Sequence, residues 1–185
     1  MQVLRNQAEA VCEDMRAISR KLFEKMNSIE ELTELREWAK TIPDKLDDFR
    51  DGIERVVKDY ELVEDFYYNL SQEDFNLRWS TVGWPHKILQ QIEQVEKQHI
   101  EDEDRFRKLQ STDQSNLNDR LDTLTMQVAG LSAHTDMNKA HEIASDVRKV
   151  NKYLKECQQQ AQIYNQRERL FGLPVTNYDR YLLDP

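Results

Sequence analysis

The protein has 185 residues, a formal net charge of −9 at pH 7 and 33% charged residues. This acidity argues against nucleic acid and anionic membranes as partners, because both select basic faces. No apolar run approaches the length of about 18 residues that a membrane-spanning helix needs. The two cysteines make no disulfide framework, which fits a reducing compartment such as the cytosol.

The first predicted helix covers residues about 1–41. Its apolar residues recur at alternating spacings of four and three, the period of one helix face. They are Leu4, Ala8, Val11, Met15, Ile18 and Leu22. Ser28 and Glu31 have the spacing of a capping box, which predicts that the helix restarts or changes phase there. No capping residue precedes the first turn, so we expect the chain to be a piece of something longer.

The second predicted helix covers residues 43–70, with Pro43 near its first turn. Its seam follows a heptad repeat, which favours packing at about 20° against a neighbouring helix. The seam residues are Leu46, Phe49, Ile53, Val56, Tyr60, Val63, Tyr67 and Leu70. A capping start at Ser71 and Asp74 then predicts a short helix over 72–81, which carries Trp79.

The segment Gly83-Trp84-Pro85 predicts the main break of the chain, because glycine permits turns and proline disfavours helix in the residue before it. Trp79 and Trp84 are expected to plug the corner of the bundle. A long helix over 85–132 follows. Its seam changes phase by one residue, which predicts a bend near 111–114.

The last predicted helix covers residues 136–171, with an N-cap at Thr135 or Asp136. Its stripe consists of Ala140, Ile143, Val147, Val150, Leu154, Cys157, Ala161 and Tyr164. Gly172 is expected to form a left-handed cap, and Pro174 cannot continue the helix. Residues 172–185 therefore form an exit segment.

These patterns predict an all-α fold, because the sequence has no strand-like alternation and no hairpin signal. Residues 1–178 are expected to form one elongated, antiparallel helical bundle of four to five long helices with coiled-coil-like heptad seams. Cys12 and Cys157 lie in or beside these stripes, so both are interpreted as small buried residues. Gly83, Trp84, Pro85, Gly172 and Pro174 are the candidate structural residues.

The sequence offers no catalytic, cofactor-binding or metal site. Its four glycines cannot form a phosphate loop, and none of the common zinc or nucleophile motifs occurs. His134 and His141 nominally share a metal face, but their supporting acids point in different directions, so surface histidines are the favoured interpretation. His86 is expected to be exposed or stacked on an indole, and His99 to lie in a semi-polar layer between helices.

An acidic run, Glu101-Asp-Glu-Asp104, stands beside Arg105, Arg107 and Lys108. It is compatible with a docking patch for a basic partner. A solvated helix face with intrahelical ion pairs is the favoured interpretation. We therefore expect that the chain by itself is not an enzyme.

Several segments together resemble the helical tail of axonemal dynein heavy chains. They are Asn76-Leu-Arg-Trp79 with Gly83-Trp-Pro85, Ala140-His-Glu-Ile-Ala144 and Asn165-Gln-Arg-Glu-Arg-Leu-Phe-Gly-Leu-Pro-Val-Thr-Asn-Tyr178. The last of these is the most specific. The resemblance covers the chain from about residue 30 onward and is closest to the single-headed inner-arm type. It places the last segment at the end of the tail, just before the linker.

The resemblance implies a non-catalytic structural segment that couples the tail to the linker of a microtubule motor in ciliary or flagellar movement. ATP hydrolysis and microtubule binding are implied only for the parent chain. The implied partners are the rest of the heavy chain, dynein intermediate or light chains, and axonemal docking proteins. The implied location is the cytoskeleton of the axoneme.

Two other interpretations remain open from the sequence. One is a spectrin-like or tethering bundle that acts as a spacer outside any motor. The other is an amphipathic membrane-bending bundle, which needs a basic concave face and is disfavoured by the net charge of −9.

Overall fold

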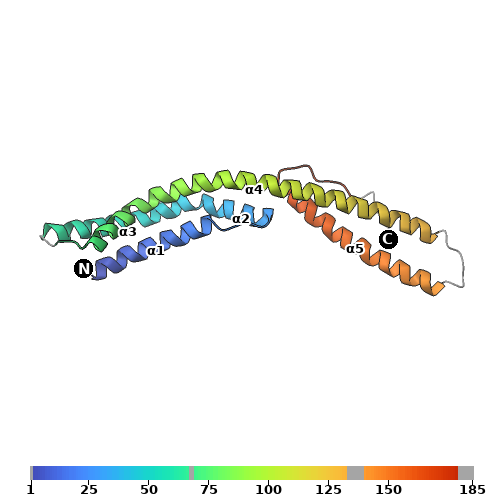
Figure 1. Ribbon diagram of the computed structural model, residues 1–185, viewed down its shortest axis with the longest axis horizontal. Coiled ribbons are helices and arrows are strands. Elements are labelled where there is room, and N and C mark those ends of the chain that lie inside the picture. Colours follow the sequence, from blue (N-terminus) through green and yellow to red (C-terminus); the bar gives the residue numbers. More distant parts are fainter. Residues whose placement is uncertain (1, 67–68, 133–139, 179–185) are drawn as a thin grey trace. The chain divides into compact units, whose positions relative to one another are not determined.

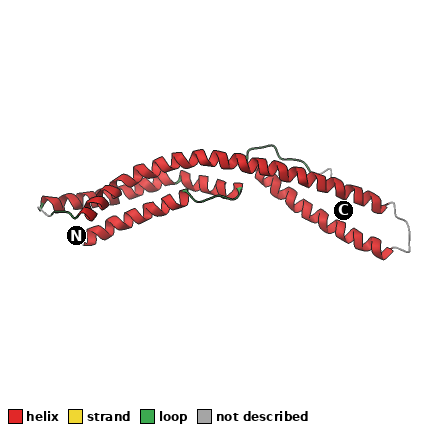
Figure 2. Cartoon of the chain, viewed as in Figure 1, coloured by secondary structure: helices red, strands yellow, loops and turns green. Residues whose placement is uncertain are grey.

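The computed structural model describes residues 2–66, 69–132 and 140–178. Over these residues the chain forms five α-helices that pack against one another and no strand, which confirms the all-α prediction (Figures 1 and 2). The helices are α1 Gln2–Leu22, α2 Ile29–Lys40, α3 Ile42–Asp65, α4 Gln72–Ser132 and α5 Ala140–Leu170. In the described part of the chain, no helix combines the length and apolar character needed to cross a bilayer.

The helices divide into two compact units, whereas the sequence predicts one bundle over 1–178. Unit 1 comprises Met1–Asp102 and unit 2 comprises Glu103–Pro185. Unit 1 therefore contains α1, α2, α3 and the first part of α4. Unit 2 contains the rest of α4, α5 and the residues after it.

Unit 1 is a bundle in which α1 runs antiparallel to α3 (Figure 1). Near the start of α1, Leu4 and Ala8 share a core cluster with Tyr60 near the end of α3. Near the end of α1, Leu22 shares another cluster with Ile42 at the start of α3. The predicted antiparallel packing of the first two long helices is therefore confirmed.

The first predicted helix ends earlier than expected, and the capping box explains why it restarts. The backbone N–H of Glu31 donates to Ser28 Oγ at 3.2 Å, and the Glu31 carboxylate accepts from the backbone N–H of Asn27 at 2.9 Å. The bond to Ser28 satisfies one of the N–H groups that a helix start leaves unpaired, and the bond from Asn27 holds the residue before the N-cap. The chain thus forms α1 and α2 in place of one helix over 1–41.

The predicted break at Gly83-Trp84-Pro85 is wrong, because α4 continues through Pro85. Proline removes the hydrogen bond to the carbonyl of Thr81, but packing around it holds the helix. Ile88 and Thr81 are fully buried, and Trp84 packs against the same core cluster as Ile88. A tertiary core therefore overrides a local helix breaker. The predicted separate helices over 72–81 and 85–132 are one element.

Trp79 does not plug a corner of the bundle, since it is 59% exposed, whereas Trp84 is partly buried against the core. Residues 111–114 are also helical, so no helix end lies there. The buried residues keep one register through this stretch, since Phe106, Gln110, Leu117 and Leu121 are spaced four, seven and four residues apart. Leu109, which the sequence places on the seam, is 54% exposed, and its neighbour Gln110 is buried.

Unit 2 is built on the pairing of α5 with the second part of α4, which run antiparallel (Figure 1). The guanidinium of Arg107 lies 5.6 Å from the ring centre of Phe171. Further along α4, Arg120 Nη1 donates to Gln160 Oε1 at 3.1 Å. The shared core contains Leu117, Leu121, Leu124, Cys157, Ala161 and Tyr178.

The stripe of α5 is confirmed in its second half, where Cys157 and Ala161 are buried. Val147 is 49% exposed, so the stripe does not extend unbroken to the start of the helix. The predicted N-caps Thr135 and Asp136, like Tyr67 and residues 179–185, lie outside the described residues.

Candidate functional site

The helix stop after α5 forms a complete hydrogen-bonded cap. Gly172 has a φ of +67°, the left-handed conformation that the sequence predicts. Its N–H donates to the carbonyl of Arg169 at 3.1 Å, and the N–H of Leu173 donates to the carbonyl of Glu168 at 2.8 Å. This is the Schellman pattern, in which two unpaired carbonyls of the last turn are satisfied.

The residues after the cap are tied back to the helices by one buried carboxylate. We call residues 172–178 the return segment. Glu168 is only 4% exposed and accepts hydrogen bonds from the backbone N–H of Thr176 at 2.7 Å and from the Thr176 hydroxyl. It also accepts from Gln114 Nε2 of α4 at 2.7 Å. Glu168 therefore joins α4, α5 and the return segment.

The hydrogen bonds keep Glu168 ionised in spite of its burial. Burial by itself raises the pKa of a carboxyl group, because it penalises the charged form. At Glu168 the bonds from Thr176 and Gln114 outweigh this effect, and the pKa lies below its ordinary value. The site is thus a buried anion held by hydrogen-bond donors.

Tyr178 anchors the far end of the return segment. Its side chain is buried in the core cluster of unit 2, and its hydroxyl accepts from Gln114 Nε2 at 3.2 Å. Burial raises the pKa of the Tyr178 phenol, so it stays protonated. Gln110 of α4 makes a further hydrogen bond to α5, because its Nε2 donates to the carbonyl of Tyr164 at 2.9 Å.

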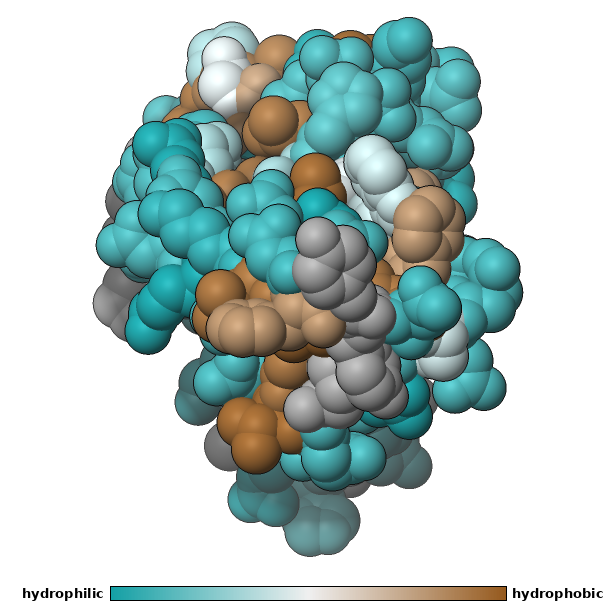
Figure 3. All heavy atoms as spheres, turned by 90° about the vertical axis from the view of Figure 1, so that its left-hand side faces the viewer, coloured by the Kyte–Doolittle hydropathy of each residue, from teal (hydrophilic) through white to brown (hydrophobic). Residues whose placement is uncertain are grey.

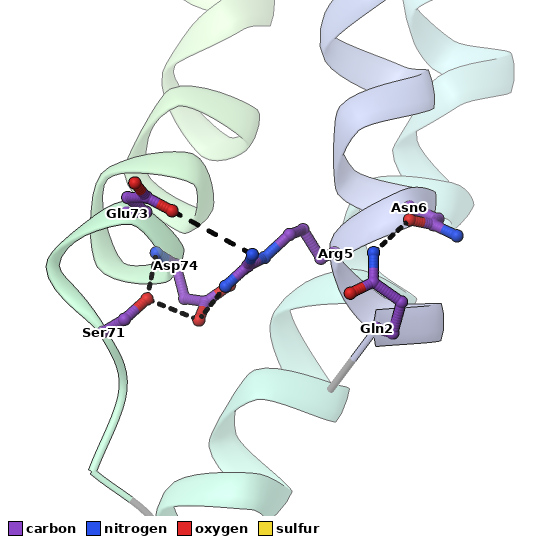
Figure 4. A network of polar contacts seen from close by, with 6 residues as sticks. All are labelled: Gln2, Arg5, Asn6, Ser71, Glu73 and Asp74. Carbon is purple, nitrogen blue, oxygen red and sulfur yellow. Dashed lines mark hydrogen bonds and ion pairs between the residues drawn. The ribbon is translucent and has the colours of Figure 1, made fainter.

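A second buried carboxylate lies in unit 1, at the start of α4 (Figure 4). Asp74 is 3% exposed and accepts two hydrogen bonds of 2.9 Å from the Nε and Nη2 atoms of Arg5 on α1. Ser71 Oγ donates to the Asp74 carboxylate at 2.6 Å and accepts from its backbone N–H at 3.1 Å. The bonds from Arg5, followed by that from Ser71, hold the pKa of Asp74 below its ordinary range.

The contact between α1 and α4 repeats one heptad later. Cys12 Sγ lies 3.4 Å from Thr81 Oγ1, and this pair has the same sequence separation of 69 residues as Arg5 and Asp74. Since the Thr81 hydroxyl gives its one hydrogen to the carbonyl of Leu77, Cys12 is the donor. Two polar pairs thus set the register of α1 along α4.

Comparison with known proteins shows which sequences the chain is similar to. No family model matches the sequence. The chain is 52% identical over 177 residues to dynein axonemal heavy chain 1 of Mus musculus and to that of Homo sapiens. It is 45% identical over 217 residues to dynein axonemal heavy chain 1 of Rattus norvegicus.

The chain is homologous to a segment of an axonemal dynein heavy chain. Each alignment covers 96% of this chain. The chain spans 4% of the length of the mouse and human proteins and 5% of the rat protein. The family resemblance seen in the sequence is therefore confirmed, and it concerns a small part of a much longer protein.

The described histidines lie apart from both carboxylate sites. His99 is buried, and Arg36 of α2 donates to its backbone carbonyl at 3.2 Å, so the predicted layer between helices is confirmed. Burial, with Arg36 nearby, lowers the pKa of His99. His86 and His141 are exposed, and His134 lies outside the described residues. Over the described residues no group of acids, histidines and cysteines gathers in a way that could hold a metal ion.

The acidic run 101–104 lies on α4 and makes ion pairs within that helix, which agrees with the favoured interpretation of the sequence. Arg107 lies 3.0 Å from Glu103, and Lys108 lies 3.2 Å from Asp104. Both cysteines are free and buried, as predicted. Among the described residues, the buried carboxylates are therefore those of Asp74 and Glu168.

The sequence reasoning missed both carboxylates, although a signal for each was present. Asp74 lies seven residues before Thr81, and Glu168 lies seven residues after Ala161, so both continue buried stripes. A charged residue at such a position indicates a partner from another element. The sequence does not show which element supplies that partner.

Proposed function

We propose that this segment is a non-catalytic structural part of the tail of an axonemal dynein heavy chain of the single-headed inner-arm type, and that it couples the tail to the linker. The observation that carries the proposal is the return segment. A chain that leaves a helix through a Schellman cap and is then bound by Glu168 and Gln114 has a defined exit direction. A defined exit direction is what a mechanical coupling between two elements requires.

The homology supports this proposal over the alternatives. It favours a motor heavy chain over a spectrin-like or tethering scaffold, since the alignments span nearly the whole chain. In the proposal, ATP hydrolysis and microtubule binding belong to other parts of the heavy chain. The location is the axoneme of cilia or flagella, and the rest of the heavy chain, intermediate or light chains and axonemal docking proteins are the partners.

Within this function, Gly172 and Pro174 form the joint at which the chain turns toward the linker. Gly83, Trp84 and Pro85 have a different role. They lie inside α4, where the hydrogen bond that Pro85 cannot make leaves one turn less stiff than its neighbours. Bending of the segment under load is therefore expected at that turn.

The proposal can be tested in the full-length heavy chain. Glu168→Gln weakens the hold on the return segment, and Gly172→Val strains the left-handed cap, because a β-branched residue disfavours positive φ. Single-particle images are expected to show a broader distribution of the angle between tail and linker in both variants, and Pro174→Ala is expected to change the mean angle.

Glu142→Gln, an exposed change on α5, is the matched control and should leave the angle unchanged. If Glu168→Gln, Gly172→Val and Pro174→Ala all gave the parent distribution, residues 172–178 would not set the exit direction and the coupling role would be rejected.

A further inference from the structure

Three exposed cations lie along one face of α5. They are Arg148, Lys152 and Lys155, which are separated by four and three residues and so share one face of the helix. We call these three residues the cation stripe. They line a hollow whose other described lining residues, all on α5, are Asn151, Glu156 and Gln159. The stripe therefore gathers positive charge at one place on a chain whose net charge is −9.

The cation stripe lies on the side of α5 that faces away from α4. Its residues precede Val150, Leu154 and Cys157 by two positions each, which is a rotation of about 200° around the helix. Cys157 belongs to the core cluster that α5 shares with α4, and Val150 packs against that cluster. Since the three cations are exposed on the opposite side, the packing of unit 2 does not account for them.

The cation stripe differs from most of the described cations, which have a partner within the chain. Lys149, next to the stripe in sequence, lies 3.2 Å from Asp146, and Lys108 of α4 lies 3.2 Å from Asp104. Over the described residues, none of the three stripe cations makes an ion pair, a hydrogen bond or a contact with an aromatic ring. Their charge is therefore available to a ligand.

The stability of α5 does not account for the cation stripe either. Like charges three and four residues apart on a helix repel each other, and residues 148–155 include four basic residues and no acidic one. Glu156 supplies one carboxylate to the hollow, so its positive charge is only partly balanced. The helix dipole favours cations in the last turn, but the stripe ends well before Leu170. An anion from outside the chain would relieve this repulsion.

Charge and hydrogen bonding, not apolar contact, set the character of the ligand. At the end of unit 1 where α4 begins, hydrophobic surface lies among hydrophilic residues (Figure 3). The hollow on α5 is different, because every one of its described lining residues is polar or charged. The amides of Asn151 and Gln159 lie there beside the cations and can hydrogen-bond the backbone of a peptide.

The size of the cation stripe favours a short acidic peptide over a larger polyanion. At a rise of about 1.5 Å per residue, the stripe is about 10 Å long and faces only a few negative charges. A nucleic acid or an anionic membrane extends beyond it and meets a chain in which 35 acidic residues outnumber 26 basic ones. A short segment with a few carboxylates matches the stripe without meeting this repulsion.

We propose that the cation stripe binds a short acidic segment of another polypeptide, with Asp or Glu side chains opposite the three cations and its backbone against Asn151 and Gln159. The charges select the partner, and the amides hold its main chain. The inference goes beyond the structural role proposed above, because it concerns a separate chain and the outer face of α5, not the return segment.

The probe is a fluorescent peptide of about ten residues with Glu at alternate positions and Ser between them. A matched peptide carries Gln in place of Glu. Fluorescence anisotropy with the 185-residue chain at low salt is expected to show binding of the Glu peptide and at least about tenfold weaker binding of the Gln peptide. Raising the salt concentration should reduce this difference, because the three cations are exposed.

Variants locate the binding surface. Lys152→Glu, at the centre of the stripe, is expected to weaken binding of the Glu peptide about tenfold or more, and Lys155→Gln about threefold. Lys97→Glu is the matched control, because it makes the same change of charge at an exposed position of α4. Lys97 likewise has no ion pair over the described residues, and its variant should change the affinity less than about twofold. Circular dichroism establishes that each variant keeps its helices.

Several results would overturn the proposal. Equal binding of the two peptides would show that charge does not select the partner. Failure of the Glu peptide to bind at low salt, or an equal effect of Lys97→Glu and Lys152→Glu, would remove the cation stripe as the site. Tighter binding of a single-stranded oligonucleotide with the same number of charges, or of vesicles that contain anionic lipid, would assign the stripe to phosphate groups if Lys152→Glu abolished it.

Self-association in sedimentation that is lost in Lys152→Glu would assign the stripe to a second copy of this chain and would also overturn the proposal. The peptide measurements do not depend on the angle between tail and linker. Failure of this proposal is therefore distinguishable from failure of the proposed coupling function.

Discussion

Among the described residues, each of the two units buries one carboxylate, but the units compensate that charge differently. In unit 1 the guanidinium of Arg5 binds Asp74 with two hydrogen bonds and joins two long helices. In unit 2 the described donors to Glu168 are the neutral groups of Gln114 and Thr176, and they hold a short segment. The ion pair of unit 1 is part of the helical bundle. The neutral donors of unit 2 hold the return segment against α4 and α5. Loss of the first should affect the whole unit, and loss of the second should act locally.

The largest effect is expected from a cavity in the core of unit 1. Ile88 is fully buried, so Ile88→Ala should lower the free energy of unfolding by about 3 kcal/mol. All three tryptophans, Trp38, Trp79 and Trp84, lie in unit 1, so their fluorescence during urea unfolding reports on this unit.

Ile100→Ala, at a position 67% exposed, is the control and should stay within about 0.5 kcal/mol. Leu121→Ala, a cavity in unit 2, should move the tryptophan transition less than Ile88→Ala. An equal shift would show that the two units unfold as one and would remove the basis of the comparison.

The next effect is expected from the ion pair. Asp74→Asn keeps the size of the side chain but removes the charge that Arg5 binds, and hydrogen bonds to charged groups contribute about 2 kcal/mol. The same tryptophan transition measures the loss. Glu73→Gln is the control, because this side chain is 87% exposed and lies 4.0 Å from Arg5. A loss equal to that of Asp74→Asn in the control would mean that burial of the pair does not matter.

A smaller and local effect is expected at Glu168. Its pKa lies below the ordinary 4.5, so the anion stabilises the folded state above that pH, and this contribution disappears as the pH falls through the folded-state pKa. Glu168→Gln should cost about 1 kcal/mol of local stability at neutral pH and remove the pH dependence below about 4.5. The amide exchange and chemical shift of Thr176 measure both.

The exposed Glu142→Gln serves as the control for this experiment. A Thr176 amide that still titrated in Glu168→Gln would show that another group binds it. Global unfolding in the variant would contradict the local role of the site.

The smallest effect concerns access to the two buried thiols. Local opening should be easier in the two-helix pairing of unit 2 than in the bundle of unit 1. Cys157 should therefore react with an aromatic disulfide about threefold faster than Cys12, which corresponds to about 0.7 kcal/mol of opening free energy. Burial raises the pKa of the Cys157 thiol, so its reaction should be slow in absolute terms. Faster labelling of Cys12 in the single-cysteine variants would reverse the comparison.

Sequence signals predicted the structure correctly where it depends on interactions between residues close together in the chain. The seam of α1 is buried at Leu4, Met15 and Leu22, as the spacing of four and three predicts. The capping box at Ser28 and the left-handed Gly172 also formed as expected. In each case the bonds or the periodicity involve residues within about one turn, so the amino acids themselves determine the outcome.

Where the conformation or burial of a residue depends on contacts with another helix, the sequence did not predict it. Pro85 marks a break by its own chemistry, but the core around Ile88 keeps α4 helical. Leu109 is the better seam residue by hydropathy, yet Gln110 is buried because it can donate to the carbonyl of Tyr164 on α5. Both outcomes require contacts across more than 30 residues of chain, which no local pattern encodes.

The sequence alone therefore determined that this chain is helical, where most of its helices cap and stop, and to which family of heavy chains it is related. Only the tertiary structure decided which carboxylates are buried and what holds them, and which cations of the described residues have no partner. The physical reason is that helix formation depends on neighbours one turn apart, whereas burial and charge compensation depend on which helices pair.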